Sequence, residues 1–236
     1  KEIGEPIFEH HEVDVTSLGY SRKRKIPTTI SYNTSKKHFK FLDEETAAIQ
    51  ERLEKELLGY EVFLTSTSRE EDKFMIRTLS DRSLGAYYFY DRNTDQLELI
   101  TEVSPWIEEN DMATMQPIQY VARDGITING YLTVPKGIQE LLAEIIYLHG
   151  GPWHRDSWGF NPEVQLLASR GYAVLQMNFR GSTGYGRKFW ELSFKQWGKN
   201  MQHDITDGVQ WLIDQGIADP QRIAIYGGSY GGYATL

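Results

Sequence analysis

Ser229 lies within the five residues Gly-Gly-Ser-Tyr-Gly at 227–231, a Gly-x-Ser-x-Gly pattern. A serine hydroxyl is a weak nucleophile, so it needs a base and must project far enough from the backbone to reach a carbonyl carbon. The pattern meets the second need on a strained strand-to-helix turn, where Gly227 and Gly231 omit β-carbons that close backbone approach would not tolerate. An apolar run at 223–226 directly precedes it. The sequence therefore favours a catalytic nucleophile at Ser229 over an ordinary serine in a glycine-rich turn.

A second glycine-rich motif, His-Gly-Gly-Pro at 149–152, directly follows a buried strand expected at 145–148. A loop in this place donates one backbone N–H to the oxyanion hole of a tetrahedral intermediate, and the residue after the nucleophile donates the other. We therefore expect Gly151 and Tyr230 to supply these two N–H groups, each worth about 3 to 4 kcal/mol of transition-state stabilisation. His149 is expected to hold the loop through hydrogen bonds, because the base of such a site follows the nucleophile in the chain.

A third glycine-rich segment, Asn-Phe-Arg-Gly-Ser-Thr-Gly-Tyr-Gly at 178–186, follows an expected strand at 173–177. It has neither the glycine spacing of a dinucleotide site nor the Gly-Lys-Ser/Thr ending of a phosphate loop, so we expect no nucleotide cofactor. We expect it to pack beneath the active site, with Arg180 paired to a carboxylate such as Asp204 or Asp207. The other histidines are His10, His11, His38, His154 and His203. They lack metal-ligand spacing, so no metal is expected either.

Strands alternate with helices over 116–236, which predicts a largely parallel sheet. The expected strands span 118–121, 128–134, 145–148, 173–177 and 223–226, with Asp124-Gly125 in the turn of an opening hairpin. One helix is expected to begin at Asn161-Pro162 and to bury Val164, Leu166 and Leu167. Another contains 205–213 and ends at Gly216. This order of elements, ending at the Ser229 turn, matches the first half of an α/β-hydrolase.

Short strands separated by turn residues over 1–115 predict a Greek key, sandwich or propeller. Runs at 60–64, 73–77, 86–90 and 96–100, with a hairpin turn at 91–95, place four strands in about 45 residues, the size of one propeller blade. A less regular set at 7–8, 13–15, 28–32 and 38–41 is a candidate second blade. Between the two sets, Asp43 is expected to cap a helix that buries Ile49, Leu53 and Leu57 and ends at Gly59.

The 236 residues are 40% hydrophobic, which is enough for a substantial core. The apolar runs fall short of the roughly 20 residues that a bilayer span needs, so we expect no membrane insertion. The formal charge is −8, and basic residues gather only at 22–25, where we expect a solvated turn; nucleic acid is therefore not an expected partner. The chain has no cysteine, so neither disulfides nor thiolate metal sites form.

Together, the motifs at 149–152, 178–186 and 227–233 resemble those of the prolyl oligopeptidase family, in the branch of acylaminoacyl peptidases and dipeptidyl aminopeptidases. Residues 80–91 are similar to the last propeller blade of such proteins. The resemblance implies the C-terminal blades of a β-propeller over 1–115 and the N-terminal half of an α/β-hydrolase domain over 116–236, both incomplete. It also implies a serine protease whose Ser-Asp-His triad hydrolyses oligopeptides through an acyl-enzyme on Ser229, with the propeller restricting access to short peptides.

The Asp and His of this family follow the serine on loops after later strands, and the sequence ends at Leu236. We therefore expect an internal fragment that is inactive alone, and a serine peptidase as the intact parent. An esterase that uses the same turn is the alternative, and a non-catalytic binding protein is a third hypothesis. The sequence leaves open the choice between endo-, exo- and acylaminoacyl-peptidase specificity, the P1 preference, the compartment, and whether the protein forms a homo-oligomer.

Overall fold

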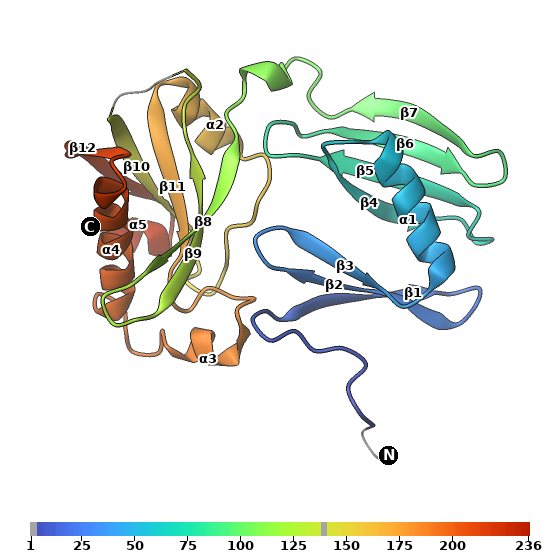
Figure 1. Ribbon diagram of the computed structural model, residues 1–236, viewed down its shortest axis with the longest axis horizontal. Helices are drawn as coiled ribbons and strands as arrows, with labels where there is room; N and C mark the ends of the chain where they lie inside the picture. Colours follow the sequence, from blue (N-terminus) through green and yellow to red (C-terminus); the bar gives the residue numbers. More distant parts are fainter. Residues whose placement is uncertain (1–3, 138–140) are drawn as a thin grey trace. The chain divides into compact units, whose positions relative to one another are not determined.

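A computed structural model describes residues 4–137 and 141–236 (Figure 1). The chain divides into two compact units, Lys1–Ile107 and Glu108–Leu236. None of the helices in the described ranges combines the length and the apolar character that crossing a bilayer requires. Each unit is built around its own sheets, and the second unit carries the three glycine-rich motifs.

The first unit contains the predicted four-stranded antiparallel meander. Its strands are β4 (Glu61–Thr67), β5 (Lys73–Leu79), β6 (Ala86–Asp91) and β7 (Gln96–Glu102), in the spatial order β4-β5-β6-β7. The predicted turn at 91–95 connects β6 to β7, where Asp91 Oδ1 accepts a 2.9 Å hydrogen bond from Asn93 N–H and Asp95 adopts a left-handed φ of 54°. The four predicted strands of this blade are therefore confirmed.

The second, less regular set forms a three-stranded sheet with the order β1-β2-β3, made of β1 (Val15–Ser21), β2 (Ile26–Asn33) and β3 (Lys37–Phe41). Two predictions here were wrong: 7–8 is not a strand and leaves Ile7 73% exposed, and the strand expected at 13–15 begins at Val15 and continues to Ser21. Most of β1 is polar or glycine, so hydrophobic alternation does not reveal it. It pairs with β2 in an antiparallel ladder, and hydroxyl contacts add to this pairing, since Ser17 Oγ lies 2.6 Å from Ser31 Oγ on β2.

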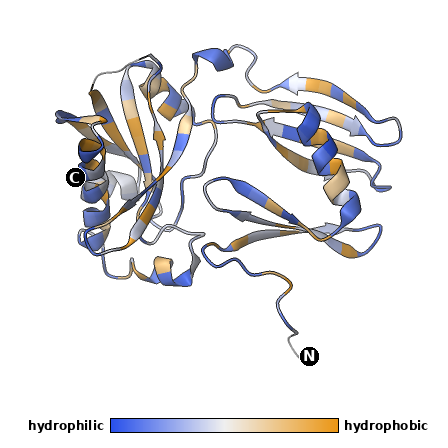
Figure 2. Ribbon diagram, in the orientation of Figure 1, coloured by the Kyte–Doolittle hydropathy of each residue, from blue (hydrophilic) through white to orange (hydrophobic). Residues whose placement is uncertain are grey.

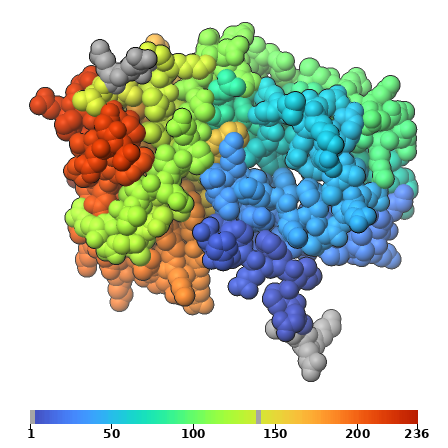
Figure 3. All heavy atoms as spheres, in the orientation of Figure 1, coloured from blue at the N-terminus to red at the C-terminus, as the bar shows by residue number. Residues whose placement is uncertain are grey.

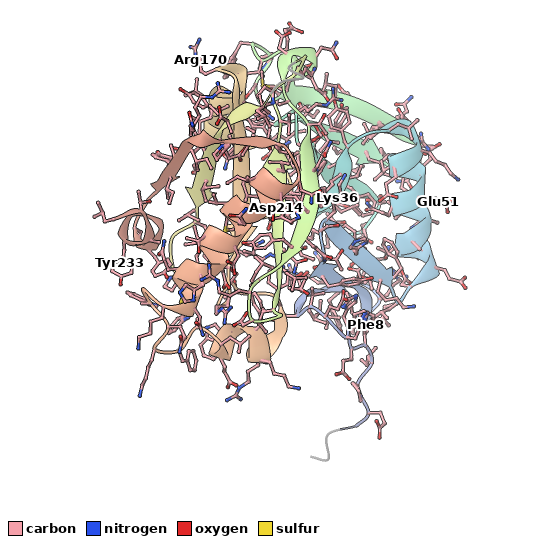
Figure 4. All side chains as sticks on the ribbon, turned by 60° about the vertical axis from the view of Figure 1, so that its left-hand side comes forward. Phe8, Lys36, Glu51, Arg170, Asp214 and Tyr233 are labelled. Carbon is pink, nitrogen blue, oxygen red and sulfur yellow. The ribbon has the colours of Figure 1, made fainter. Side chains whose placement is uncertain are left out.

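Helix α1 (Glu44–Glu56) joins the two sheets of this unit and matches its prediction. Asp43 caps it by accepting a 2.9 Å hydrogen bond from Thr46 N–H. Its buried residues Ile49 and Leu53 share a hydrophobic cluster with side chains of β4, β5 and β6. Glu51, on the opposite side of the helix, points outward (Figure 4). The helix is thus held by one apolar face and one capping carboxylate.

The second unit is organised around a five-stranded sheet with the order β12-β10-β11-β9-β8. The hairpin strands β8 (Met115–Val121) and β9 (Thr127–Thr133) are antiparallel, whereas β10 (Leu142–Leu148), β11 (Tyr172–Asn178) and β12 (Ala218–Gly227) run parallel to one another. All five predicted strands are confirmed, and β12 starts earlier than expected. Because β10, β11 and β12 are parallel, their carboxyl ends meet at one edge of the sheet, where the three glycine-rich motifs begin.

Helices cover both faces of this sheet. Helices α4 (Asn200–Asp214) and α5 (Tyr230–Thr235) share one hydrophobic core with β10 and β11, the strands along which Figure 2 shows apolar residues concentrated. Helix α2 (Pro162–Ser169) packs against β11 and β9, and two short helices, η1 (Glu109–Asp111) and α3 (Gly186–Glu191), lie in connecting segments. Figure 3 shows α4 (orange-red) beside the β8–β9 hairpin (lime green) on one face.

Helix α2 begins as predicted, with Asn161 Oδ1 accepting hydrogen bonds from the N–H groups of Glu163 and Val164. Its predicted apolar face was partly wrong. Val164 is buried, but Leu166 is 56% exposed, and the buried positions are completed by Gln165 and Ala168. Gln165 occupies a core position because its carboxamide pairs with both backbone groups of Ala113, at 2.9 and 2.8 Å. A buried polar residue that satisfies its hydrogen bonds in this way breaks the apolar period that the prediction used.

Candidate active site

Ser229 occupies the turn between β12 and α5, as its motif predicts. Its backbone has φ 55° and ψ −119°, a left-handed conformation that costs energy for any residue with a β-carbon. Helix α5 begins directly after the serine, because Tyr233 N–H donates the first helical hydrogen bond to Ser229 O at 3.0 Å. The serine is therefore the capping residue of α5 at the carboxyl edge of the sheet, where side chains of parallel α/β sheets meet their ligands.

The glycines beside Ser229 differ in what they are needed for. A β-carbon added to Gly231 would lie 2.3 Å from Leu148 O, and one added to Gly227 would lie 2.8 Å from the same oxygen. Both distances are too short for real contacts, so the end of β10 passes the turn at backbone distance. A β-carbon on Gly228 meets nothing within 4 Å. Lack of space for a β-carbon therefore explains Gly227 and Gly231, and it does not explain Gly228, the residue directly before the serine.

The loop at 149–152 lies directly against the serine. A β-carbon added to Gly150 would lie 3.2 Å from Ser229 Cβ and 3.6 Å from Ser229 Oγ. Gly151 adopts a φ of 117°, which only glycine takes up readily, and its peptide bond to Pro152 is cis. The structure thus adds Gly150 to the residues of the site as the closest approach of the loop to the hydroxyl. Its signal in the sequence was the first glycine of the His-Gly-Gly-Pro motif.

Tyr230 is the first residue of α5, and its ring is buried. The ring centroid lies 5.5 Å from that of Phe179 and 5.0 Å from that of Trp197. This packing fixes the residue whose backbone N–H follows the serine at the start of the helix, where N–H groups have no partner within the helix itself. Tyr230 directly follows Ser229, and Gly151 directly follows Gly150, which approaches the serine. The roles of Tyr230 and Gly151 as oxyanion donors remain predictions.

His149 holds the loop, as expected for a structural histidine. Its Nδ1 lies 2.8 Å from Gly150 O and its Nε2 lies 2.9 Å from Ser182 Oγ, while the ring stacks on Phe179 at 4.4 Å. Burial lowers the pKa of His149 to about 4, so the ring is neutral at neutral pH. Ser182 Oγ also donates its hydroxyl proton to Phe179 O at 2.7 Å, so this serine links the His149 ring to the backbone of the 178–186 segment.

Arg180 of the 178–186 segment is buried in an ion-pair network. It donates to Asp204 at 2.8 and 2.6 Å, which confirms the first of its two predicted partners. Asp207 was the wrong alternative. It lies about one helical turn after Asp204, faces the β8–β9 hairpin, and accepts hydrogen bonds from Arg123 instead, at 2.9 and 2.7 Å. The second partner is Asp124, which accepts from Arg180 at 2.8 and 3.0 Å.

Asp124 was expected only as a turn residue of the hairpin. Hydrogen bonds from the Arg180 guanidinium hold the pKa of its carboxyl below its ordinary value. A network of one cation and two carboxylates therefore fastens the 178–186 segment to both the hairpin and α4. This fastening places the segment beneath the 149–152 loop, where Ser182 reaches His149.

The strand order β12-β10-β11-β9-β8, with the nucleophile turn between β12 and α5, defines the second unit as the first half of an α/β-hydrolase. Residues 158–236 match the model of the prolyl oligopeptidase family. This match confirms the resemblance predicted from the motifs.

Three relatives illustrate the similarity. The chain is 36% identical to dipeptidyl aminopeptidase BIII of Pseudoxanthomonas mexicana over 216 residues, which are 88% of the chain and 31% of the relative. A puromycin-hydrolyzing peptidase of Mycobacterium tuberculosis is 30% identical with a TM-score of 0.60, over 70% of the chain and 26% of that structure. An acylaminoacyl peptidase of Pyrococcus horikoshii has a TM-score of 0.67 at 20% identity, over 95% of the chain and 35% of that structure. This last likeness supports the fold alone.

The structural neighbours combine a propeller with an α/β-hydrolase domain, so the predicted fold class is confirmed for this chain. The chain spans no more than about a third of the length of these relatives, with values of 31%, 26% and 35%. What the whole protein hydrolyses is therefore a matter for proposal.

Proposed function

We propose that the protein is a serine-type peptidase that hydrolyses short peptides through an acyl-enzyme on Ser229. The observation that carries this proposal is the approach of Gly150, in the 149–152 loop, to the Ser229 side chain at a left-handed strand-to-helix turn. Such a turn exposes a hydroxyl, and a loop of backbone N–H groups beside it can stabilise the oxyanion that forms when the hydroxyl attacks a carbonyl. The match of residues 158–236 to the prolyl oligopeptidase family supports the peptidase chemistry.

In the proposed reaction, Ser229 Oγ attacks the carbonyl carbon of the scissile peptide bond and its proton passes to the histidine base. The carbonyl oxygen gains negative charge and accepts hydrogen bonds from Gly151 N–H and Tyr230 N–H. The C–N bond then breaks, and the leaving amine takes the proton from the base. Water hydrolyses the resulting ester in a second round with the same base, which returns the proton to Ser229.

Two further proposals concern the organisation of the chain. Residues 1–115 belong to a propeller and residues 116–236 to the hydrolase domain, and the acid and base of the triad follow Leu236 in the intact parent. Removing the base from a serine triad costs about a millionfold in kcat. The 236 residues alone are therefore proposed to be inactive. The relative named a dipeptidyl aminopeptidase and the structure named a puromycin-hydrolyzing peptidase support short peptides as the substrate class.

The proposal is tested with the full-length parent, assayed on a peptide anilide and on an ester with the same acyl group. Hydrolysis of both substrates, abolished by Ser229→Ala, is the expected result. Cleavage of the ester alone would favour the esterase, and inertness towards both would favour a binding protein that kept the fold. The 236-residue chain, assayed in parallel, is expected to cleave neither substrate.

A further inference from the structure

The oxyanion loop has a second attachment, at its far end from His149. Asn178, the last residue of β11, is fully buried, and its carboxamide pairs with the backbone of Asp156. Asn178 Oδ1 accepts from Asp156 N–H at 2.8 Å, and Asn178 Nδ2 donates to Asp156 O at 3.0 Å. One side chain thus satisfies both backbone groups of a single loop residue, in the way that a neighbouring strand would.

The segment 149–156 is held at both ends by the segment 178–186. His149 contacts Ser182 near the end of β10, and Thr183 N–H donates to His154 O at 2.9 Å. Between these attachments lie Gly150 and Gly151, which have no side chains of their own to anchor them. The position of the Gly151 N–H therefore depends on where the two ends are held.

The residue type at 178 follows from this task. This pairing needs an acceptor and a donor on one planar group, which a carboxamide of this length provides without depending on pH. The second Nδ2 hydrogen goes to Tyr185 OH at 2.9 Å, and Arg155 Nη2 donates to the same hydroxyl at 2.9 Å. Both carboxamide atoms are thereby engaged in one orientation, since reversing the amide would set donor against donor and acceptor against acceptor.

We propose that Asn178 is a positioning residue of the oxyanion hole, acting through the backbone of Asp156 on the Gly151 N–H. This inference rests on the proposed function and deepens it, because Asn178 touches neither the serine nor the substrate. Its contribution appears when negative charge develops on the substrate oxygen, since a displaced N–H binds the neutral ground state almost as well. A displacement of about 1 Å at such a donor lowers the rate about a hundredfold.

The test uses the full-length parent with Asn178→Leu, which keeps the branching at Cγ and removes both hydrogen bonds to Asp156. We expect kcat to fall about a hundredfold with KM nearly unchanged. A peptide boronic acid, whose tetrahedral adduct places an oxygen in the oxyanion hole, is expected to bind more weakly by a similar factor. Tyr185→Phe is the matched comparison, because it removes the two hydrogen bonds that Tyr185 OH accepts and leaves the Asn178–Asp156 pair in place. It is expected to lower kcat much less than Asn178→Leu does.

Asn178→Asp provides a readout that a purely structural role would not change. When protonated, the new carboxyl can accept from Asp156 N–H and donate to Asp156 O, whereas the ionised form cannot donate. The ratio of variant to native kcat/KM is therefore expected to rise as the pH is lowered. A ratio that does not vary with pH, or an Asn178→Leu variant that folds and keeps the native kcat, would overturn the inference. Should Asn178→Leu fail to fold, the pH dependence of Asn178→Asp decides.

The two proposals can fail separately. Activity that depends on Ser229 but is indifferent to Asn178 rejects the positioning role and leaves the peptidase intact. Native protein without hydrolytic activity rejects the proposed function itself, and with it the inference.

Discussion

A buried carboxyl in the centre of the hydrolase sheet makes stability depend on pH in an unusual direction. Glu144 lies on β10 between β11 and β12, is 1% exposed, and has no hydrogen-bond partner for either carboxylate oxygen among the described residues. Burial raises its pKa to about 8 from an ordinary 4.5. The residue is therefore neutral in the folded protein at neutral pH.

The direction in which stability changes with pH follows from whether the folded or the unfolded chain binds the proton more tightly. Below pH 4.5 the carboxyl is protonated in both the folded and the unfolded chain, so its ionisation does not change the free energy of unfolding. As the pH rises towards 8, only the unfolded chain gains charge, and folding loses stability at about 1.4 kcal/mol per pH unit. Between pH 5 and pH 8.5 the loss amounts to about 4 kcal/mol. Glu144→Gln has no such term, so its stability relative to the native protein should increase with pH by this amount.

Hydrogen exchange of the β10 amides measures the opening free energy of this sheet without requiring the whole protein to unfold in one step. After correction for intrinsic exchange rates, the difference between Glu144→Gln and the native protein is expected to grow with pH. Glu98→Gln, on an exposed position of β7, is the control for loss of a carboxyl. A difference that is flat with pH, or that reverses to favour the native protein at high pH, would refute the reasoning and indicate a partner for the ionised Glu144.

Two further predictions concern the packing of the site. Gly231→Ala places a β-carbon 2.3 Å from Leu148 O, so this variant should lose hydrolysis of the peptide anilide. Gly228→Ala adds a β-carbon that meets nothing within 4 Å, so this variant should stay folded. Equal effects of the two substitutions on folding and hydrolysis would contradict this account of the turn. Asp204→Asn breaks the buried ion pair and should cost about 3 to 5 kcal/mol in urea denaturation. Arg123→Ala removes a surface pair and should cost less than about 1 kcal/mol.

Local signals in the sequence were sufficient for most elements. The sheet of the second unit was predictable because its strands are short apolar runs bounded by glycine and proline. Helix α1 was predictable because the capping residue Asp43 and the four-residue spacing of Ile49, Leu53 and Leu57 agree. Most of strand β1 was missed because it pairs with β2 through its backbone and hydroxyl groups and lacks apolar alternation. The exposed Leu166 was missed because Gln165 takes its core position by pairing with a distant backbone.

The residues of the candidate site also divide into those that the sequence predicts and those that it does not. The Ser229 turn and the His149 loop are contiguous motifs, so their residues could be named from the sequence. The second partner of Arg180 could not, because Asp124 lies 56 residues away on a hairpin whose approach depends on tertiary packing. The pairing of Asn178 with Asp156 spans 22 residues and involves one backbone, which has no signature in residue type.

The central claim is that Ser229 is the nucleophile, and covalent labelling tests it most directly. The full-length parent is treated with a fluorophosphonate, which reacts with activated serine hydroxyls, and the modified residue is located by mass spectrometry. We predict a single adduct on Ser229 that appears in step with loss of peptidase activity and is absent in Ser229→Ala. An adduct on another serine that accounts for the lost activity, or full activity retained by Ser229→Ala, would contradict the account.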